Sequence, residues 1–170
     1  MSALDPILAR WPIFAFVISA AMLAIAHGFQ TFGHLAPCHL CLKQREVYWV
    51  ALPVSAAAAL GLATRFRDRS LREGSILLAL IFAYGAYLAG FHAGAEWHWW
   101  SAPVTCSSTG PVNLRDLTAL LHGGRLRSPA CDQAPWVFLG LSMAGWNFVV
   151  SVGLVALSAL SALRAGKPAQ

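Results

Sequence analysis

The chain has very little charge. Only 11% of its 170 residues are charged, whereas soluble domains are about a quarter charged. Four long intervals contain no Lys, Arg, Asp or Glu: 11–42, 47–64, 74–95 and 133–163. These intervals also lack polar faces at helical period, which excludes a soluble helical bundle. What the chain has in abundance is apolar sequence, with 58% hydrophobic residues and a mean hydropathy of +0.60.

Each of these intervals is long enough for a helix that crosses a bilayer. The shortest has 18 residues and would extend about 27 Å, close to the ~30 Å hydrocarbon core. A fifth charge-free interval, 97–114, contains too many Pro, Gly, Ser and Thr residues to span. We therefore predict an all-α membrane protein: one domain over 1–170, built as a bundle of four transmembrane helices at about 11–29, 42–63, 74–91 and 136–163.

Basic residues predict the orientation. The segment 65–73 carries four arginines in nine residues, and other basic residues precede the first predicted span and follow the fourth. Because cytoplasmic loops are enriched in Lys and Arg, we expect both termini and the loop 64–73 to be cytoplasmic. The loops 30–41 and 92–135 then lie on the outer side. The net charge of +5 reflects this topology, and we expect no nucleic-acid partner.

The second outer loop contains one helical pattern. Its leucines recur at helical spacing, with Arg115 and Asp116 off their face; they are Leu114, Leu117, Leu120 and Leu121. The pattern predicts a short amphipathic helix over 112–121 on the membrane surface. A helix packed on the rest of the loop would fit the same pattern.

All four cysteines fall in the two outer loops. Cys38 and Cys41 precede the second predicted span, and Cys106 and Cys131 lie between the third and the fourth. Disulfides form and persist outside the cytoplasm. The predicted topology therefore makes disulfide chemistry available to every cysteine of the chain.

Cys38 and Cys41 form a CxxC pair, and Arg45 follows one helical turn later. If a helix begins near Cys38, its dipole and Arg45 both favour a thiolate at Cys41, the species that reacts in exchange. Two other interpretations are an inert disulfide across a four-residue loop and a zinc site completed by His34 or His39. Thiolate-rich zinc sites usually pair two CxxC-type knuckles, and the second cysteine pair lacks that spacing, so we expect no metal.

Cys106 and Cys131 are separated by 24 residues rich in turn formers. A disulfide that closes this loop would contribute about 3.5 kcal/mol and could be purely structural. In another interpretation, an outside thiol attacks this pair, and exchange passes the electrons on to Cys38 and Cys41. The electrons then need an acceptor. Because Cys41 is predicted at the membrane surface, a lipid-soluble quinone fits.

Histidines and one acid allow further interpretations. His27 and His92 flank the outer ends of the first and third spans, where they could ligate a haem. A histidine at a membrane boundary is more often a hydrogen-bonding residue. Glu96 is the one acid in the aromatic stretch 91–100 and would either orient the loop or bind an ion. The pattern assigns no role to His39.

Four stretches of the sequence resemble the DsbB family, the bacterial inner-membrane disulfide bond formation proteins. They are the sequence Cys38-His39-Leu40-Cys41 followed by Arg45, the sequence FHAGAE at 91–96, Gly110-Pro111 after a cysteine, and the sequence CDQAPW at 131–136. The resemblance covers nearly the whole chain in order, which makes it far more specific than a lone CxxC.

The resemblance implies roles for individual residues. Cys106 would take the attack of a periplasmic DsbA-like thiol oxidant, Cys131 would be displaced and exchange with Cys38, and Cys41 would reduce ubiquinone or menaquinone. Arg45 and His92 match positions near the quinone. The family fold, four transmembrane helices with a membrane-associated helix in the second periplasmic loop, agrees with the fold expected from hydropathy.

We therefore expect an enzyme, a quinone-dependent protein-disulfide oxidoreductase of the bacterial inner membrane with periplasmic cysteines. Two rivals belong to other classes. One is a non-enzymatic membrane protein whose cysteines are only staples, and the other is a haem-binding electron carrier. The sequence does not distinguish the two quinones, or a general partner from a dedicated one.

Overall fold

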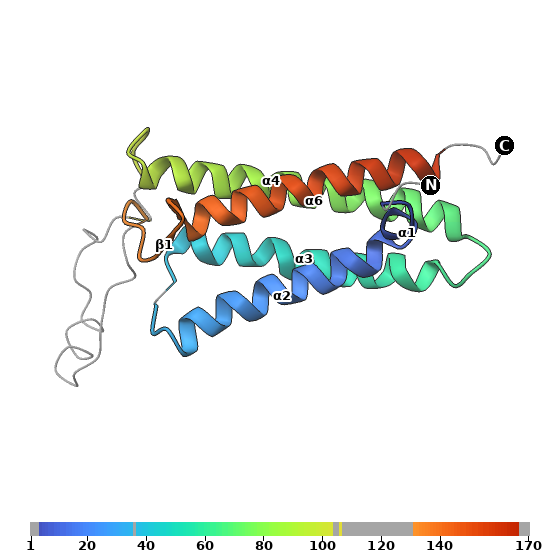
Figure 1. Ribbon diagram of the computed structural model, residues 1–170, viewed down its shortest axis with the longest axis horizontal. Coiled ribbons are helices and arrows are strands. Elements are labelled where there is room, and N and C mark those ends of the chain that lie inside the picture. Colours follow the sequence, from blue (N-terminus) through green and yellow to red (C-terminus); the bar gives the residue numbers. More distant parts are fainter. Residues whose placement is uncertain (1–3, 36, 104–105, 107–130, 167–170) are drawn as a thin grey trace.

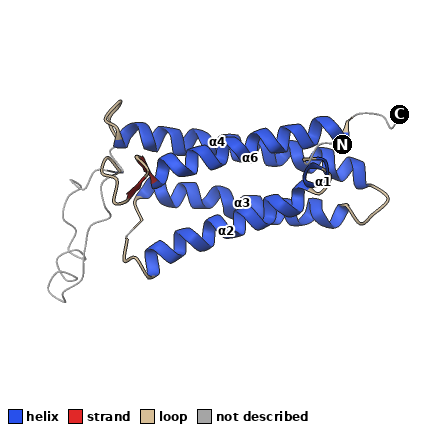
Figure 2. Ribbon diagram, viewed as in Figure 1, coloured by secondary structure: helices blue, strands red, loops and turns tan. Residues whose placement is uncertain are grey.

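The structure is a computed structural model that describes residues 4–35, 37–103, 106 and 131–166. Four long helices run side by side along one axis, so the described chain is mostly helical, as predicted (Figures 1 and 2). The elements in chain order are α1 (Asp5–Leu8), α2 (Trp11–Thr31), α3 (His39–Gly61), α4 (Arg67–Glu96), β1 (Val137–Phe138), β2 (Leu141–Ser142) and α6 (Met143–Ala165). The surface helix predicted over 112–121 lies outside the described residues.

Within the described residues, three helices are long and apolar enough to cross a membrane: α2, α4 and α6. Their outward faces carry exposed apolar side chains such as Val17, Leu80 and Leu163, which suit contact with lipid better than contact with water. The remaining long helix, α3, is not among them and carries Lys43 and Arg45 near its start. The span expected over 42–63, the second of the four, therefore stays a prediction.

The start of the predicted fourth span, 136–163, is wrong. Residues 137–142 form a two-stranded antiparallel hairpin in which Val137 pairs with Ser142. At its turn, Leu139 and Gly140 have φ of 51° and 80°, the left-handed conformations that tight hairpins require. Ser142 then caps α6, because its Oγ accepts a hydrogen bond from the backbone N of Gly145 at 3.1 Å. The segment is as apolar as a helix, and composition alone does not reveal the turn.

The helix α4 is longer than the predicted span 74–91 at both ends. It begins at Arg67, so most of the predicted loop 64–73 is helical, and Arg69 pairs with Glu73 one turn later at 2.8 Å. At its other end it continues to Glu96 and so includes His92. Charged residues end an apolar interval without ending a helix, because Arg and Glu are good helix formers.

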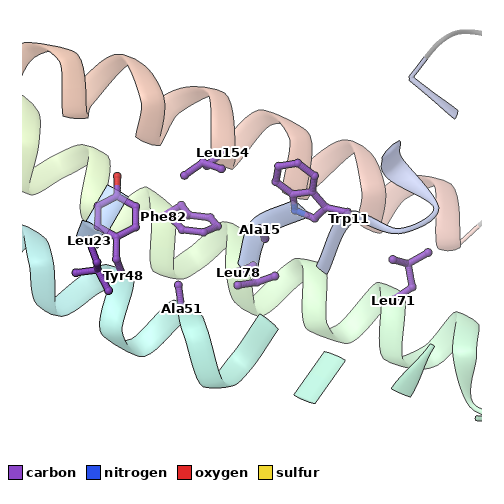
Figure 3. Packing of buried hydrophobic residues seen from close by; sticks show 9 residues of the cluster. All are labelled: Trp11, Ala15, Leu23, Tyr48, Ala51, Leu71, Leu78, Phe82 and Leu154. Atoms are coloured by element: carbon purple, nitrogen blue, oxygen red, sulfur yellow. The ribbon is translucent and has the colours of Figure 1, made fainter. Parts of the chain in front are cut away.

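The bundle core is formed by nine buried residues from all four long helices (Figure 3). Phe82 and Leu78 of α4 are completely buried, with 0% of their surface exposed. The ring of Tyr48 in α3 packs at a tilt against the ring of Phe82. The helices approach closely at Gly85, where a Cβ atom would lie 3.0 Å from Val47 Cγ1. Such close approach is typical of membrane helix packing.

Buried polar groups pair between helices at the end of the bundle that holds α1. The indole N–H of Trp11 in α2 donates to Ser158 Oγ in α6 at 2.8 Å. Ser75 Oγ of α4 donates to Ser161 Oγ at 3.1 Å, and Ser161 in turn donates to the carbonyl of Leu8 at 2.9 Å. These bonds hold the short α1 and three long helices together at one end.

The Trp11–Ser158 bond gives a test of this packing. Trp11→Phe keeps an aromatic ring but removes the donor, so we expect the free energy of unfolding to fall by about 1 kcal/mol. Unfolding would be followed by titration with sodium dodecyl sulfate in mixed micelles. Ser158→Ala in the Trp11→Phe background should cost less than Ser158→Ala in the wild type. Equal costs in both backgrounds would show that the bond does not contribute.

Candidate active site

The helix α3 begins where the CxxC pattern predicts. Cys38 is its N-cap residue, in an extended conformation, and its Sγ accepts a hydrogen bond from the backbone N of Cys41 at 3.2 Å. This cap folds the four residues into the first helical turn, with the two sulfurs 2.7 Å apart and both cysteines free thiols. Cys38 is buried and Cys41 is half-buried.

The two thiols differ in acidity. The Cys38 thiol donates a hydrogen bond to Cys41 Sγ, and this bond is the main cause that lowers the pKa of Cys41. Burial and the charge of Glu96 act in the opposite direction, and the charge of Arg45 lowers the pKa further. The same hydrogen bond, together with burial, raises the pKa of Cys38. Cys41 is therefore the thiolate of the pair, and Cys38 holds the proton.

The second cysteine pair reaches the same place. Cys106 and Cys131 form a disulfide with Cα atoms 5.3 Å apart, and both residues are buried. The Sγ atoms of Cys38 and Cys131 and a ring nitrogen of His92 all lie within 4.8 Å of one another. The two predicted outer loops therefore converge at the start of α3, at the opposite end of the bundle from α1 (Figure 1).

His92, near the end of α4, is the centre of the polar contacts. Its Nε2 lies 3.6 Å from Cys38 Sγ and 3.7 Å from Glu96 Oε1, and its Nδ1 accepts a hydrogen bond from Gln44 at 2.9 Å. Glu96 in turn accepts a hydrogen bond from Ser142, the cap of α6. The sequence left the role of Glu96 open. In the structure Glu96 joins the end of α4 to the start of α6.

A chain of buried side chains continues from His92 through three helices. Asn147 of α6 donates to Gln44 Oε1 at 2.5 Å, and Tyr48 donates to Asn147 Oδ1 at 2.5 Å. Ser151 lies 3.3 Å from the Tyr48 hydroxyl. Sequence reasoning missed these residues, although an amide inside an apolar span is itself a signal, because a polar group in a membrane helix needs a partner.

A cavity of about 360 Å³ adjoins the CxxC turn. Cys41, Gln44, Arg45 and His92 contribute to its wall. The rest is largely apolar or aromatic and includes Met22, Phe29, Trp136, Phe138, Met143 and Trp146. A mainly apolar cavity with a few polar groups is the usual form of a small-molecule site.

Arg45 connects α3 to α2 beside this cavity. Its guanidinium donates to Gln30 Oε1 at 2.6 Å and to the carbonyl of Ala26 at 3.0 Å. Of the six residues named from the sequence, the structure brings Cys38, Cys131 and His92 into one cluster, with Cys41 beside it. Cys106 joins through its disulfide, and Arg45 lies at the cavity wall.

The other histidines considered from the sequence lie outside this cluster. His27 Nδ1 contacts the carbonyl of Leu23, one turn earlier in α2, at 2.8 Å. Neither His34 nor His39 belongs to a group of three or more potential metal ligands within the described residues. Within the described residues, His34 and His39 therefore do not join the CxxC pair in a cluster of potential zinc ligands.

Comparison with known proteins gives a consistent result. The family model described as "Disulfide bond formation protein DsbB" matches residues 9–161. A disulfide bond formation protein B of Methylococcus capsulatus is 32% identical over 157 residues, which cover 87% of this chain and 90% of that protein. One from Albidiferax ferrireducens is 34% identical over 161 residues, covering 88% and 84%. One from a Polaromonas species is 30% identical over 155 residues, covering 84% of each chain.

The unequal acidity of the CxxC thiols can be measured by alkylation. The fully reduced protein would be treated with iodoacetamide at a series of pH values, and each cysteine quantified by peptide mass spectrometry. We expect Cys41 to be modified with a midpoint below that of an ordinary thiol, because its thiolate is hydrogen-bonded, and Cys38 to react slowly throughout. Cys38→Ala should raise the Cys41 midpoint, whereas Cys106→Ala should leave it in place. Faster modification of Cys38 than of Cys41 at low pH would contradict the assignment.

Proposed function

The chain belongs to the DsbB family of disulfide bond formation proteins, and from this premise we propose that it is a quinone-dependent thiol oxidase. It re-oxidises a periplasmic DsbA-like thioredoxin-fold protein by disulfide exchange. The electrons go to a membrane quinone, and protein disulfide formation is thereby sustained. The observation that carries the proposal is the convergence of the two cysteine pairs, with Cys38, Cys131 and His92 within 4.8 Å of one another.

The exchange steps follow from this convergence. A thiolate of the partner attacks Cys106 Sγ, the Cys106–Cys131 bond breaks, and Cys131 leaves as a thiolate. Cys131 then attacks Cys38 of an oxidised Cys38–Cys41 pair, and Cys41 leaves. The partner's second thiolate releases the partner as a disulfide, and Cys106 then displaces Cys38 from Cys131, which restores the Cys106–Cys131 bond. The sum is oxidation of one partner dithiol and reduction of the Cys38–Cys41 disulfide.

The cavity beside Cys41 suits a quinone ring. Its wall is largely apolar, its volume of about 360 Å³ is that of a small-ligand site, and it includes Cys41 with the cation of Arg45. Bound there, ubiquinone or menaquinone would accept two electrons and two protons and leave as the quinol. Arg45 supplies positive charge beside Cys41, and His92 Nε2 lies 3.6 Å from Cys38 Sγ.

The proposed topology has four spans, with α3 as the second, in the bacterial inner membrane. Its support is the arrangement in Figure 2: the start of α3 lies at one end of the bundle, and α1, the α3–α4 connection and the end of α6 lie at the other. The cysteine cluster lies at the start of α3. Arg65, Arg67 and Arg164 belong to this second end. By the bias of basic residues this end is cytoplasmic and the cysteines are periplasmic. A surface helix over 112–121 completes the proposal.

The proposal is tested by an anaerobic assay on the purified protein. Reduced thioredoxin-fold oxidant is mixed with ubiquinone or menaquinone, and quinone absorbance is followed. We expect stoichiometric quinone reduction that falls to the protein-free rate in Cys41→Ser, because no other thiol adjoins the cavity wall in the described residues. If neither quinone is reduced, by protein whose four cysteines form two disulfides, the result would instead favour a non-enzymatic membrane protein whose disulfides are only structural.

Arg45 should matter more for the quinone than for the partner. Arg45→Ala removes the positive charge from the cavity wall but leaves the cysteine cluster intact. We expect kcat/KM for quinone to fall roughly tenfold or more, while the rate of disulfide exchange with the partner changes little. Lys43→Ala is the matched control, since Lys43 is on the same helix but pairs with Glu46 at the surface. An equal loss of quinone reduction and exchange would refute this role of Arg45.

A further inference from the structure

The buried cluster at the start of α3 has the composition of a soft-metal site. Cys38 Sγ, Cys131 Sγ and a ring nitrogen of His92 lie within 4.8 Å of one another, and all three residues are buried. Thiolate sulfur and imidazole nitrogen are the donors that zinc and its heavier relative cadmium prefer. From these observations we propose that the reduced chain binds one such divalent cation through Cys38, Cys131 and His92.

The distances fit tetrahedral coordination. Zn–S bonds of about 2.3 Å and Zn–N bonds of about 2.0–2.1 Å, at the tetrahedral angle, separate a sulfur and a nitrogen ligand by about 3.6 Å. Cys38 Sγ and His92 Nε2 are 3.6 Å apart. Two sulfur ligands of one zinc ion would be about 3.8 Å apart by the same geometry, so Cys131 Sγ, within 4.8 Å of both atoms, needs to approach by no more than about 1 Å.

The surroundings of His92 provide a second, independent observation. A metal-bound histidine usually has its other ring nitrogen held by a hydrogen bond, which fixes the orientation of the ring. In this structure the Gln44 amide lies 2.9 Å from His92 Nδ1 and is itself held by Asn147 at 2.5 Å. When the Gln44 and Asn147 amides are turned over, Nδ1–H donates to Gln44 Oε1, and the lone pair of Nε2 is free for a metal. This leaves Nε2 as the nitrogen that faces Cys38. The ring is therefore already oriented as a ligand.

The oxidation state controls whether this site exists. In the structure Cys131 is bonded to Cys106, so its sulfur is not available as a thiolate. When a dithiol reduces that bond, the dithiol becomes a disulfide and Cys106 and Cys131 become thiols; in the cell this step rests on the proposed exchange with a partner. Metal binding then displaces the thiol protons of Cys38 and Cys131 to the solvent. The metal would hold the chain in its reduced form, because both sulfurs needed for exchange are ligated.

This differs from the zinc site weighed from the sequence. The sequence pattern suggests His34 or His39 as partners of the CxxC pair, because both are near it in the chain, but it lacks the second CxxC knuckle of a thiolate-rich zinc site. The cluster instead recruits His92, 54 positions from Cys38, and Cys131 from the far side of the second loop. Spacing along the chain did not reveal it.

The proposal is tested by titrating the reduced protein with Cd²⁺. The purified chain is reduced with dithiothreitol, freed of reductant under anaerobic conditions, and titrated while the thiolate-to-cadmium absorbance in the ultraviolet is followed. We expect one ion per chain, and an affinity lower by about tenfold or more in Cys131→Ser and in His92→Ala. Cys106→Ser is the matched control and should bind as the wild type does, because Cys106 lies outside the cluster of three.

The titration is interpreted only for variants that fold. Circular dichroism of each variant would first establish that its helices are intact. If folded Cys131→Ser or His92→Ala binds Cd²⁺ as tightly as the wild type, the ion is held by the CxxC pair alone and the proposal is refuted. Because the titration uses neither quinone nor partner, its failure leaves the proposed oxidase activity untouched. Conversely, a failed quinone assay would leave a positive titration standing.

Discussion

The cap that Cys38 places on α3 is the interaction on which the whole site depends. Because Cys38 Sγ accepts the backbone N–H of Cys41, the helix begins at the next residue and Cys41 lies in its first turn. From that point Cys41, Gln44, Arg45 and Tyr48 recur at helical spacing on one face, and all four line the cavity. One capped turn therefore sets the thiolate, a hydrogen-bonding amide and a cation along a single wall.

The second constraint is that polar groups at this depth must be paired. An unpaired buried amide costs about 1–3 kcal/mol, so Gln44 and Asn147 are held to each other and to their neighbours. Gln44 reaches His92 on α4, and Asn147 on α6 reaches back to Tyr48 on α3. The chain thus joins three helices and directs the His92 ring toward Cys38. Positioning of the histidine and cohesion of the bundle have the same physical cause.

The sequence predicted the helices better than the contacts between them. Charge-free intervals predicted α2, α4 and α6, because a membrane helix is apolar over its full length. They failed at 137–142, where a turn depends on two left-handed residues in a segment as apolar as a helix. The CxxC pair and Arg45 were predictable because their spacing is local. The bond between Gln44 and Asn147 joins residues 103 positions apart, and no local pattern contains it.

Disulfide exchange and metal binding impose similar demands on this cluster. The proposed exchange requires that Cys131 and Cys38 come into contact, and that the attacking sulfur be a thiolate. A tetrahedral ion requires two sulfurs and an imidazole gathered around one point, with the sulfurs about 3.8 Å apart. A cluster that performs the proposed exchange therefore already holds the ligands that an ion would need. The Cys106–Cys131 bond determines which of the two processes is possible, because Cys131 cannot bind a cation until a dithiol has reduced this disulfide. In the proposed function the Cys106–Cys131 disulfide therefore has two effects: it is the bond that the partner attacks, and it keeps Cys131 from binding a cation.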